Sequence, residues 1–341
     1  HRVHRRQRQM CIRDSNMLDS EIVQANTTLP EYFTKHGYIT MSKGKIFHKH
    51  TTVNGLDHGH WAFDIWEKVD GRQKIDPALY FCRDEGIIRG EKIENPKYVK
   101  GGGSRLAFGP LLNATEETKD YNTAKWFEAK LQEDYDKPFF MAVGISKPHL
   151  PFHAPKEFFD MHPIEDVVVP EFRMDDLNDI LNERGDAAFK PHVDFLWCQE
   201  YGVMKEAVQA YLATVSYADA CVGVVLDALA KSQYADNTIV VIWGDHGWHL
   251  GEKLKFRKAS LWREATQLPL IIQTPDMQNG QDCTRNVNLI DLYPTLVDLC
   301  GLPEKELDGT SIKQLLDNPT LEWRPTVTTQ DKGNHSVMSE R

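Results

Sequence analysis

The stretch TIVVIWGDHGWHLGE, residues 238–252, decides the fold of this chain. Its five consecutive apolar residues, 239–243, predict a strand buried on both faces, as strands of parallel sheets are. The chain then turns at Gly244 and presents Asp245 and His246. In open α/β sheets ligands bind beyond the carboxyl ends of the strands, and an adjacent carboxylate and imidazole can both face one metal ion. The stretch therefore predicts an α/β fold with a metal site at this strand end. The alternative is an ordinary surface turn, which Gly and Asp also favour.

Strand and helix patterns alternate on both sides of this stretch. Further strands are predicted at 38–42, 138–146 and 268–273, and helices at 28–37, 121–133, 205–231 and 289–299. At the first helix, Thr28 and Glu31 have capping-box spacing, and Gly37 suits a left-handed helix end. Such alternation predicts a mostly parallel central sheet with helices on both faces. Residues 50–115 and 156–200 show little periodicity, and we expect loops there over the rim of the sheet.

The chain is acidic overall, with 341 residues, 40 of them basic and 50 acidic, and a net charge of −10. Residues 1–15, HRVHRRQRQMCIRDS, contain five arginines and one acid and resemble a translated cloning adapter, so we expect a non-native leader there. Without them, 35 basic and 49 acidic residues give a net charge of −14. Such a body predicts no nucleic-acid partner, because phosphates need a basic face, and no membrane-surface role. No apolar run approaches the length of a membrane span.

The six cysteines stand far apart and form no CxxC pair. Cys221 and Cys300 fall on apolar faces of predicted helices, so we expect buried thiols there. Cys82 and Cys198 could form a disulfide, but sequence does not decide connectivity. The cysteines therefore leave the cellular compartment open.

Lysines and histidines gather at three predicted strand ends, GKIFH at 44–48, KPH at 147–149 and DHG at 245–247. A fourth segment, GEKLKFRKAS at 251–260, adds four cations within a few residues. Cations that converge in an acidic chain indicate an anionic substrate, with lysines as compact charges and histidines as hydrogen-bonding or proton-transfer groups. A metal ion with oxygen ligands would complete the charge neutralisation. The alternative is that each lysine is solvated and each histidine is an ordinary core residue.

Five stretches together resemble the sulfatase family of the alkaline-phosphatase-like fold, most closely iduronate-2-sulfatase and its bacterial relatives. They occur in the family's order and cover most of residues 26–303. The stretches are TLPEYFTKHGYITMSKGKIFH, PFFMAVGISKPHLPFHAPKEFF, YLATVSYADACVGVVLDAL, TIVVIWGDHGWHLGEKLKFRKASLWREATQLPLII and NLIDLYPTLVDLCGLP. The resemblance implies a sulfuric ester hydrolase that uses calcium and removes sulfate from a sulfated carbohydrate. It also implies secretion or export to a periplasm, and it does not indicate an oligomeric state.

The resemblance assigns roles to residues around the anion. Asp245 and His246 match the Asp-His pair that holds calcium in this family. Lys45 and His48 match the lysine and histidine of the GKxFH segment, which contact the sulfate and the nucleophile.

Four further residues match positions around the ester and the sugar. His149 resembles the histidine placed near the ester oxygen, and Lys258 resembles a sulfate-binding lysine. Trp248 and His249 are expected to face the sugar and to help set specificity, with a structural role as the alternative for Trp248.

The chain departs from the family at the nucleophile. Sulfatases use a formylglycine made from the first residue of a C/S-x-P/A-x-R motif, and none of the cysteines or serines here has that context. The tandem acids of the first strand are absent too, and both features are expected before residue 16. We therefore interpret residues 16–325 as an N-terminally truncated catalytic domain and 326–341 as the start of a truncated C-terminal subdomain. The 341 residues alone are expected to be inactive.

Two other functions remain open at this point. One is a phosphatase or phosphodiesterase of the same superfamily, which would use a Thr or Ser nucleophile with transition metals; the GKxFH and KPH segments disfavour it. The other is a catalytically dead protein that keeps the anion pocket and binds sulfated glycans. The sugar, the sulfate position and exo or endo action depend on rim residues 50–115 and 156–200, which the sequence does not resolve.

Overall fold

The computed structural model of the chain describes residues 23, 25–47, 62–99, 106–182, 184–277, 279–329 and 335–339. Its central strands form two hydrogen-bonded groups. Strands β1 (Ile39–Gly44), β2 (Ile65–Glu67) and β7 (Phe139–Gly144) make a parallel sheet in the order β2-β1-β7. Strand β8 (Val240–Trp243) pairs with β11 (Leu270–Gln273). The expected α/β class is confirmed, with a parallel sheet at its centre.

Strand β8 differs from its prediction in two ways. It is antiparallel to β11, whereas residues 239–243 were expected in a parallel sheet. It is also only partly buried, and Trp243 is 47 % exposed. Among the described residues β11 is the strand that pairs with β8, so one edge of β8 carries no strand partner there. The continuous apolar run therefore predicted the position of the strand correctly. It predicted the pairing direction and the burial of the strand wrongly.

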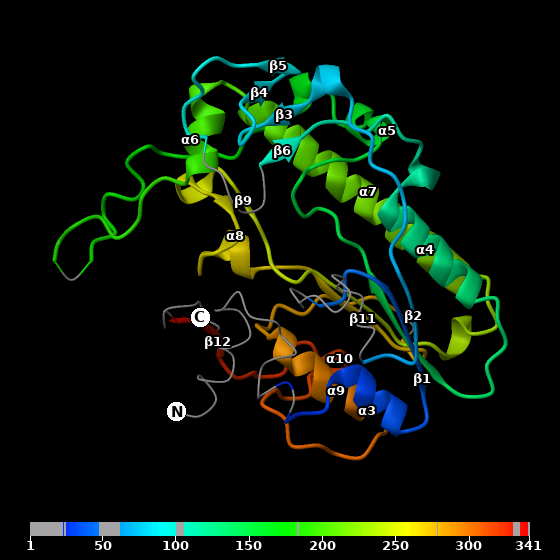
Figure 1. Cartoon of the computed structure of the whole chain (residues 1–341). Helices are drawn as coiled ribbons and strands as arrows, with labels where there is room; N and C mark the ends of the chain where they lie inside the picture. Colours follow the sequence, from blue (N-terminus) through cyan, green and yellow to red (C-terminus); the bar gives the residue numbers. More distant parts are fainter. Residues whose placement is uncertain are drawn as a thin grey trace.

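Helices cover both faces of these strands, as the alternating pattern predicts (Figure 1). On one face α4 packs against β1 and β7 and is itself covered by α7; on the other, α3 packs against β1 beside α9 and α10. The bounds are α3 Leu29–Lys35, α4 Lys119–Lys130, α7 Met204–Ala230, α9 Leu292–Leu299 and α10 Lys313–Asp317. Each predicted helix is therefore present, with its ends shifted by a few residues.

Local sequence rules explain the first helix. The backbone N–H of Thr28 donates to the Glu31 carboxylate over 2.8 Å, which completes the capping box of α3. Two residues after the helix, Gly37 adopts φ +88°, the left-handed conformation that turns the chain into β1. This turn delivers β1 directly under α3, where Phe33 is buried against Phe140 of the neighbouring strand.

The rim segments, expected as loops, hold a second sheet and two helices. Four two-residue strands form an antiparallel sheet in the order β5-β4-β3-β6, and α5 and α6 lie in the second segment. Strands this short leave no periodicity to detect. The bounds are β3 Phe81–Cys82, β4 Ile87–Ile88, β5 Glu91–Lys92, β6 Ala107–Phe108, α5 Lys156–Asp160 and α6 Val193–Glu200.

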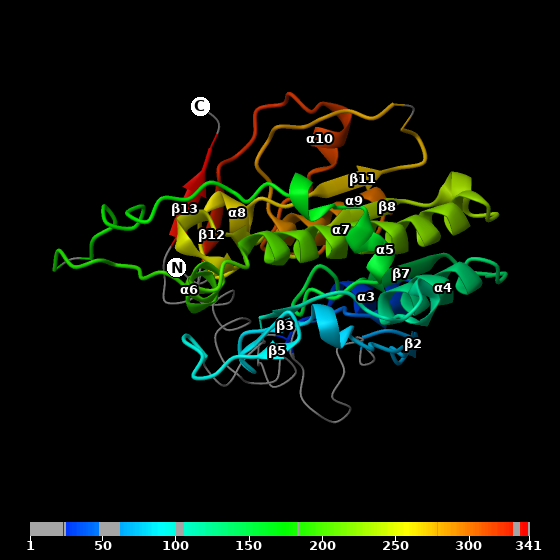
Figure 2. The same ribbon diagram turned by 90° about the horizontal axis from the view of Figure 1, so that it is seen from above.

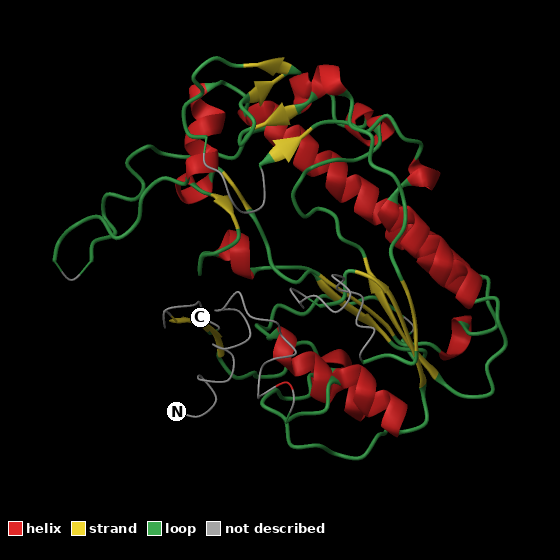
Figure 3. Cartoon of the chain, in the orientation of Figure 1, coloured by secondary structure: helices red, strands yellow, loops and turns green. Residues whose placement is uncertain are grey.

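The remaining elements are short, and loops join them (Figure 3). Seen from above, the long loop that precedes α6 projects from the body at the end where α6 and α8 lie (Figure 2). The bounds are β9 His249–Leu250, β10 Phe256–Arg257, α8 Arg263–Thr266, β12 Thr326–Thr329 and β13 His335–Met338, with 3₁₀ turns at Pro77–Leu79, Thr115–Glu117, Ile164–Asp166, Ala235–Asn237, Glu252–Leu254 and Leu289–Asp291.

Helix α7 has 27 residues and, by length and composition, could cross a membrane. A single helix of this kind is weak evidence for a span, and Ala207, Ala213 and Tyr217 tie α7 into the core.

The described cysteines are all free thiols. Cys82, Cys198 and Cys221 are buried, and Cys300 is only partly buried. The disulfide considered between Cys82 and Cys198 is therefore not formed in this structure. The expectation of a buried thiol is confirmed at Cys221.

Candidate active site at the strand ends

The candidate site begins where β1 and β7 end level with each other. Gly44 pairs with Gly144 in register, and the backbone N–H of Lys45 then donates to the Gly144 carbonyl over 2.9 Å. Gly44 has φ +92°, and a Cβ there would lie 2.0 Å from the Gly144 oxygen, so only glycine fits. This close approach fixes Lys45 at the strand end. His48, predicted beside it, lies outside the described residues.

The KPH segment after β7 is held by its own lysine. Lys147 is buried; its backbone N–H donates to the Asp120 carboxylate over 3.0 Å and its Nζ to the Pro151 carbonyl over 2.6 Å. Burial lowers the pKa of Lys147 to about 8, and burial also raises the pKa of Asp120. The lysine of KPH thus ties the loop to α4 and leaves His149 as the segment's reactive side chain. The sequence pattern did not distinguish the anchoring role of Lys147 from the reactive role of His149.

His149 stands among three other cationic or titratable groups. Its Nδ1 lies 2.7 Å from the Leu150 carbonyl, which can only accept, so Nδ1 carries the proton and Nε2 keeps a lone pair. Burial, together with the charges of Lys45, Lys258 and His246, lowers the pKa of His149 to about 4. These interactions indicate that the three predicted strand ends and the 251–260 segment converge. At neutral pH the imidazole is therefore uncharged.

Asp245 and His246 present two metal-binding groups side by side. The Nδ1 of His246 lies 2.8 Å from the Gly247 carbonyl, so Nε2 is the lone-pair atom, 3.5 Å from a carboxylate oxygen of Asp245. That Nε2 is buried and has no hydrogen-bond partner, while the Asp245 side chain is 66 % exposed. A Cβ at Gly247 would meet the Glu264 carbonyl at 2.1 Å, which explains the glycine of this turn. The pair fits as two ligands of a cation.

A complete metal site is not assembled within the described ranges. No group of three His, Cys, Asp or Glu side chains able to hold a metal is found there. Further ligands of an ion at Asp245 and His246 would come from elsewhere.

The Trp248 side chain packs against rings of the site and of the core. Its ring centroid lies 6.5 Å from that of His149, 6.3 Å from that of His246 and 5.8 Å from that of Phe152. Its indole Nε1 is buried without a hydrogen-bond partner. The ring therefore separates the two histidines from the core, the structural role that was considered as the alternative for it.

His249 was expected to face the sugar, but the structure buries it completely. Its Nδ1 lies 3.1 Å from the Glu252 carbonyl and its Nε2 lies 2.7 Å from the Ser260 hydroxyl. Both ring nitrogens are thus used inside the loop. In this position the imidazole holds the loop together, because both of its nitrogens have partners within the loop.

Lys258 follows a buried ionic bridge that sequence reasoning missed. Arg257 donates from Nε to the Asp194 carboxylate over 2.6 Å, and Arg83 donates to the other oxygen of the same group. Asp194 has no exposed surface. The bridge joins α6, the small rim sheet and β10, so it anchors the backbone next to Lys258. Only burial reveals this role, since Asp194 lies in a segment without periodicity.

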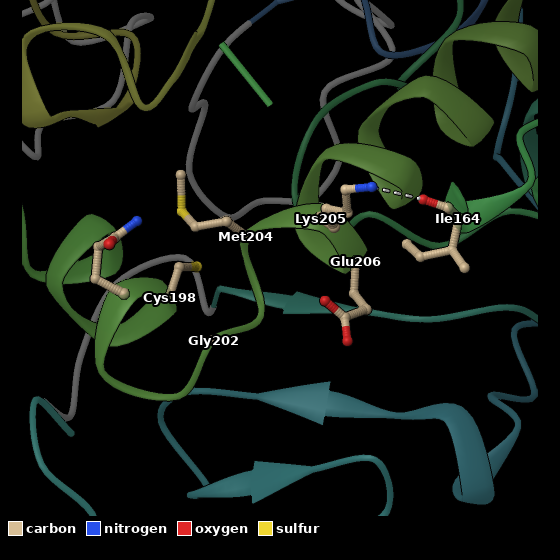
Figure 4. Close-up of a pocket in the computed structure, with 7 residues that line it drawn as sticks. Ile164, Cys198, Gly202, Met204, Lys205 and Glu206 are labelled. Atoms are coloured by element: carbon tan, nitrogen blue, oxygen red, sulfur yellow. Dashed lines mark hydrogen bonds between the residues drawn. The ribbon is translucent and has the colours of Figure 1, made fainter. Parts of the chain in front are cut away.

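The two main cavities lie away from these side chains. One, of about 420 Å³, opens where α7 begins (Figure 4), and the other, of about 300 Å³, lies between α4 and the end of α7. Neither of these two cavities is lined by a predicted site residue. The first cavity is lined by Ile164, Cys198, Gln199, Gly202, Met204, Lys205 and Glu206.

Known proteins resemble this chain in sequence over most of its length. The family model described as Sulfatase matches residues 7–302. A sulfatase of Formosa agariphila is 33 % identical over 330 residues, which cover 95 % of this chain and 62 % of that protein. Iduronate 2-sulfatase of Mus musculus is 30 % identical over 327 residues, with 81 % of this chain and 54 % of that protein covered. The chain thus spans little more than half the length of these relatives.

Two solved structures share the fold. The phosphonate monoester hydrolase SpPMH from Silicibacter pomeroyi matches with a TM-score of 0.63 and 18 % identity over 88 % of this chain and 63 % of that one. The structure of Ps i-CgsB in complex with k-i-k-neocarrahexaose matches with a TM-score of 0.59 and 18 % identity, covering 96 % and 67 %. At such identity these likenesses show the alkaline-phosphatase-like fold alone.

Proposed function

Because the chain belongs to the sulfatase family, we propose that the protein hydrolyses sulfate esters of carbohydrates. The observation that supports this most is the convergence of Lys45, Lys258 and His149 beside Asp245 and His246. Two ammonium groups and a cation-binding pair at converging strand ends suit a group with several negative oxygens. The likeness to iduronate 2-sulfatase supports a sulfated uronic acid or a similar sugar as the substrate.

The lysines would act on the charge of the sulfate. Lys45 is fixed by the glycine contact between β1 and β7, and Lys258 by the buried bridge at Arg257. Groups held in place before the reaction stabilise developing charge without reorganising, which is how such sites accelerate transfer reactions. We assign sulfate binding to these two side chains.

His149 would move a proton at the ester oxygen. Without a ligand its Nε2 is a free lone pair and its pKa is about 4. A bound sulfate ester brings negative charge close to the ring and raises that pKa, since an opposite charge favours the protonated form. The imidazolium could then donate from Nε2 to the leaving oxygen.

Asp245 and His246 are proposed to hold a calcium ion. The Asp245 carboxylate supplies the hard oxygen that calcium prefers. The Nε2 of His246, which has no hydrogen-bond partner, would be a second ligand. A bound ion would neutralise sulfate charge next to the lysines. The nucleophile is proposed to be a formylglycine, which the 341 residues do not supply.

Ligand binding tests this function on the chain itself. Isothermal titration calorimetry with iduronate-2-sulfate and with unsulfated iduronate should show binding of the sulfated sugar only. Lys45→Ala and Lys258→Ala should each weaken it, whereas Lys156→Ala, which removes an exposed lysine paired with Asp160, should not. Equal binding of both sugars, or equal affinity in all three variants, would contradict a sulfate site at these lysines.

A catalytically dead sulfated-glycan binder is the second candidate, because the residues proposed to bind the sulfate would serve it equally. It predicts the same binding and no turnover. Sulfate release by the complete encoded protein separates the two functions.

A further inference from the structure

One lysine close to the candidate site has aromatic neighbours in place of an acidic one. The Nζ of Lys255 lies 5.3 Å from the ring centroid of Trp262 and 5.9 Å from that of Phe189. The two rings lie 5.3 Å apart, inclined by 59°. The Lys255 ammonium donates a hydrogen bond to the Ala259 carbonyl over 2.9 Å. The three side chains form a partly open corner on the surface.

In the described part of the chain no carboxylate lies within ion-pair distance of the Lys255 ammonium. Its neighbour Lys253 shows the ordinary arrangement, with Nζ 2.9 Å from the Asp176 carboxylate. Burial lowers the pKa of Lys255, and no acid opposes that effect. An unpaired, half-desolvated ammonium attracts an anion more strongly than a solvated one, because the local dielectric constant is lower.

This aromatic corner adjoins the sulfate site. Lys255 directly precedes strand β10, and Lys258 directly follows it. Trp262 contacts the ring of His249 at 5.9 Å, and His249 directly follows Trp248, which packs against His149. The loop that carries Phe189 projects from the body on the side of β9 and α8 (Figure 1). A ligand that extends from the sulfate site along this loop would reach the corner.

We propose that Phe189, Lys255 and Trp262 form a subsite for a second anionic sugar, next to the sugar whose sulfate is removed. Phe189 is 36 % exposed and offers its ring to the apolar face of a pyranose, while Lys255 pairs with the carboxylate or sulfate of that sugar. Sites of this kind combine aromatic surface with a few placed polar groups. The inference rests on the proposed function and deepens it, since it makes a sulfated oligosaccharide the preferred substrate.

The test compares a long and a short ligand on the same chain. A heparin-derived tetrasaccharide and the monosaccharide iduronate-2-sulfate are titrated calorimetrically into the 341-residue protein. Loss of one partly buried charged contact should weaken tetrasaccharide binding by about tenfold in Lys255→Gln. Phe189→Ala should weaken it in the same direction. Binding of the monosaccharide should stay unchanged in both variants.

Controls separate the subsite from general electrostatics and from misfolding. Lys253→Gln removes the same charge two residues away and should leave tetrasaccharide affinity unchanged, and Lys255→Arg should retain it. An equal loss for both ligands in Lys255→Gln would overturn a separate subsite and assign Lys255 to the sulfate site. Unchanged tetrasaccharide affinity would overturn the subsite and leave the proposed function standing. If neither ligand binds the unaltered chain, both proposals fail.

Discussion

At the scale of single residues, Asp245 and His246 combine a solvent-facing carboxylate with a buried nitrogen that has no partner. Burying a polar atom without a hydrogen bond costs free energy, so we expect the lone pair of this nitrogen to bind an electrophile such as a metal ion. We predict that Asp245→Ala in the complete enzyme abolishes both calcium binding and turnover. Atomic absorption on the purified variant and sulfate-release kinetics measure the two effects. Normal kcat with a full metal content would refute the assignment.

Lys258 is predicted to act mainly in the transition state. Removing one preorganised charge from such a site costs on the order of 3 kcal/mol of transition-state stabilisation, about a hundredfold in rate. Lys258→Ala should therefore lower kcat/KM of the complete enzyme by that order, with Lys258→Arg recovering part of it. A kcat/KM within a few-fold of the unaltered enzyme would make Lys258 a surface residue.

Two buried histidines predict a fall in stability under mild acid. Burial lowers the pKa of His149 and of His153 to about 4 from an ordinary value of 6.5. Between these values the unfolded chain binds protons that the folded chain does not, so the free energy of unfolding decreases as pH falls from 6.5 to 4. Above pH 6.5 it should be flat with respect to these groups.

Urea denaturation at pH 7 and pH 5 measures this slope. His153→Asn should reduce the difference between the two pH values, because His153 is 2 % exposed and its Nδ1 is hydrogen-bonded to the Gly109 carbonyl. An unchanged difference would show that other groups titrate in this range.

At the scale of elements, the buried bridge at Asp194 connects α6, β10 and the rim sheet through Arg257 and Arg83. Removing the carboxylate takes away the buried counter-ion that Arg257 and Arg83 share, while Arg83 keeps its pair with Asp84. Breaking a buried pair from one side costs about 3–5 kcal/mol. We predict that Asp194→Ala lowers the free energy of unfolding by that amount, as measured by urea denaturation.

An exposed pair serves as the control for the bridge. Asp175 pairs with Arg173 on the surface, where solvent screens the charges, so Asp175→Ala should change stability little. If the two variants lost similar stability, the bridge would not hold these elements together.

Elements with strong patterns were predictable from sequence. The capping box at Thr28 and the end at Gly37 set α3 correctly, and the apolar runs located β7 and β8 within two residues. The rim sheet was not predictable, since each of its strands has two residues and is defined by pairing with distant partners. The antiparallel pairing of β8 with β11 was missed for the same reason, because register and direction arise from tertiary contacts.

The candidate site was predictable where a strand end displays its residues. Lys45, His149 and the 245–246 pair follow strands that the sequence predicts, and the structure brings them together with Lys258. The anchoring role of Asp194 was not predictable, because the sequence does not distinguish a buried acid from an acid on the surface. His249 illustrates the converse, a polar side chain on a motif that the fold turns inward.

At the scale of the whole molecule, the central strands form two separate hydrogen-bonded groups, β2-β1-β7 and β11-β8, with helices on both sides (Figure 1). The proposed anion site lies at the carboxyl ends of β1, β7 and β8, where open α/β sheets bind ligands. The hairpin β12–β13 begins at Thr326, where we expect a further subdomain to start. That boundary, the non-native leader at 1–15 and export from the cytoplasm stay predictions.

The measurement that tests the central claim most directly is turnover by the complete encoded protein on matched esters. A sulfated uronide, the corresponding phosphate monoester and a phosphonate monoester are compared by ion chromatography of the released anion, since the fold also occurs in a phosphonate hydrolase. The account predicts that sulfate is released fastest and that Lys258→Ala suppresses this release. Faster hydrolysis of the phosphorus esters, or no release of sulfate from any sulfated sugar, would contradict it.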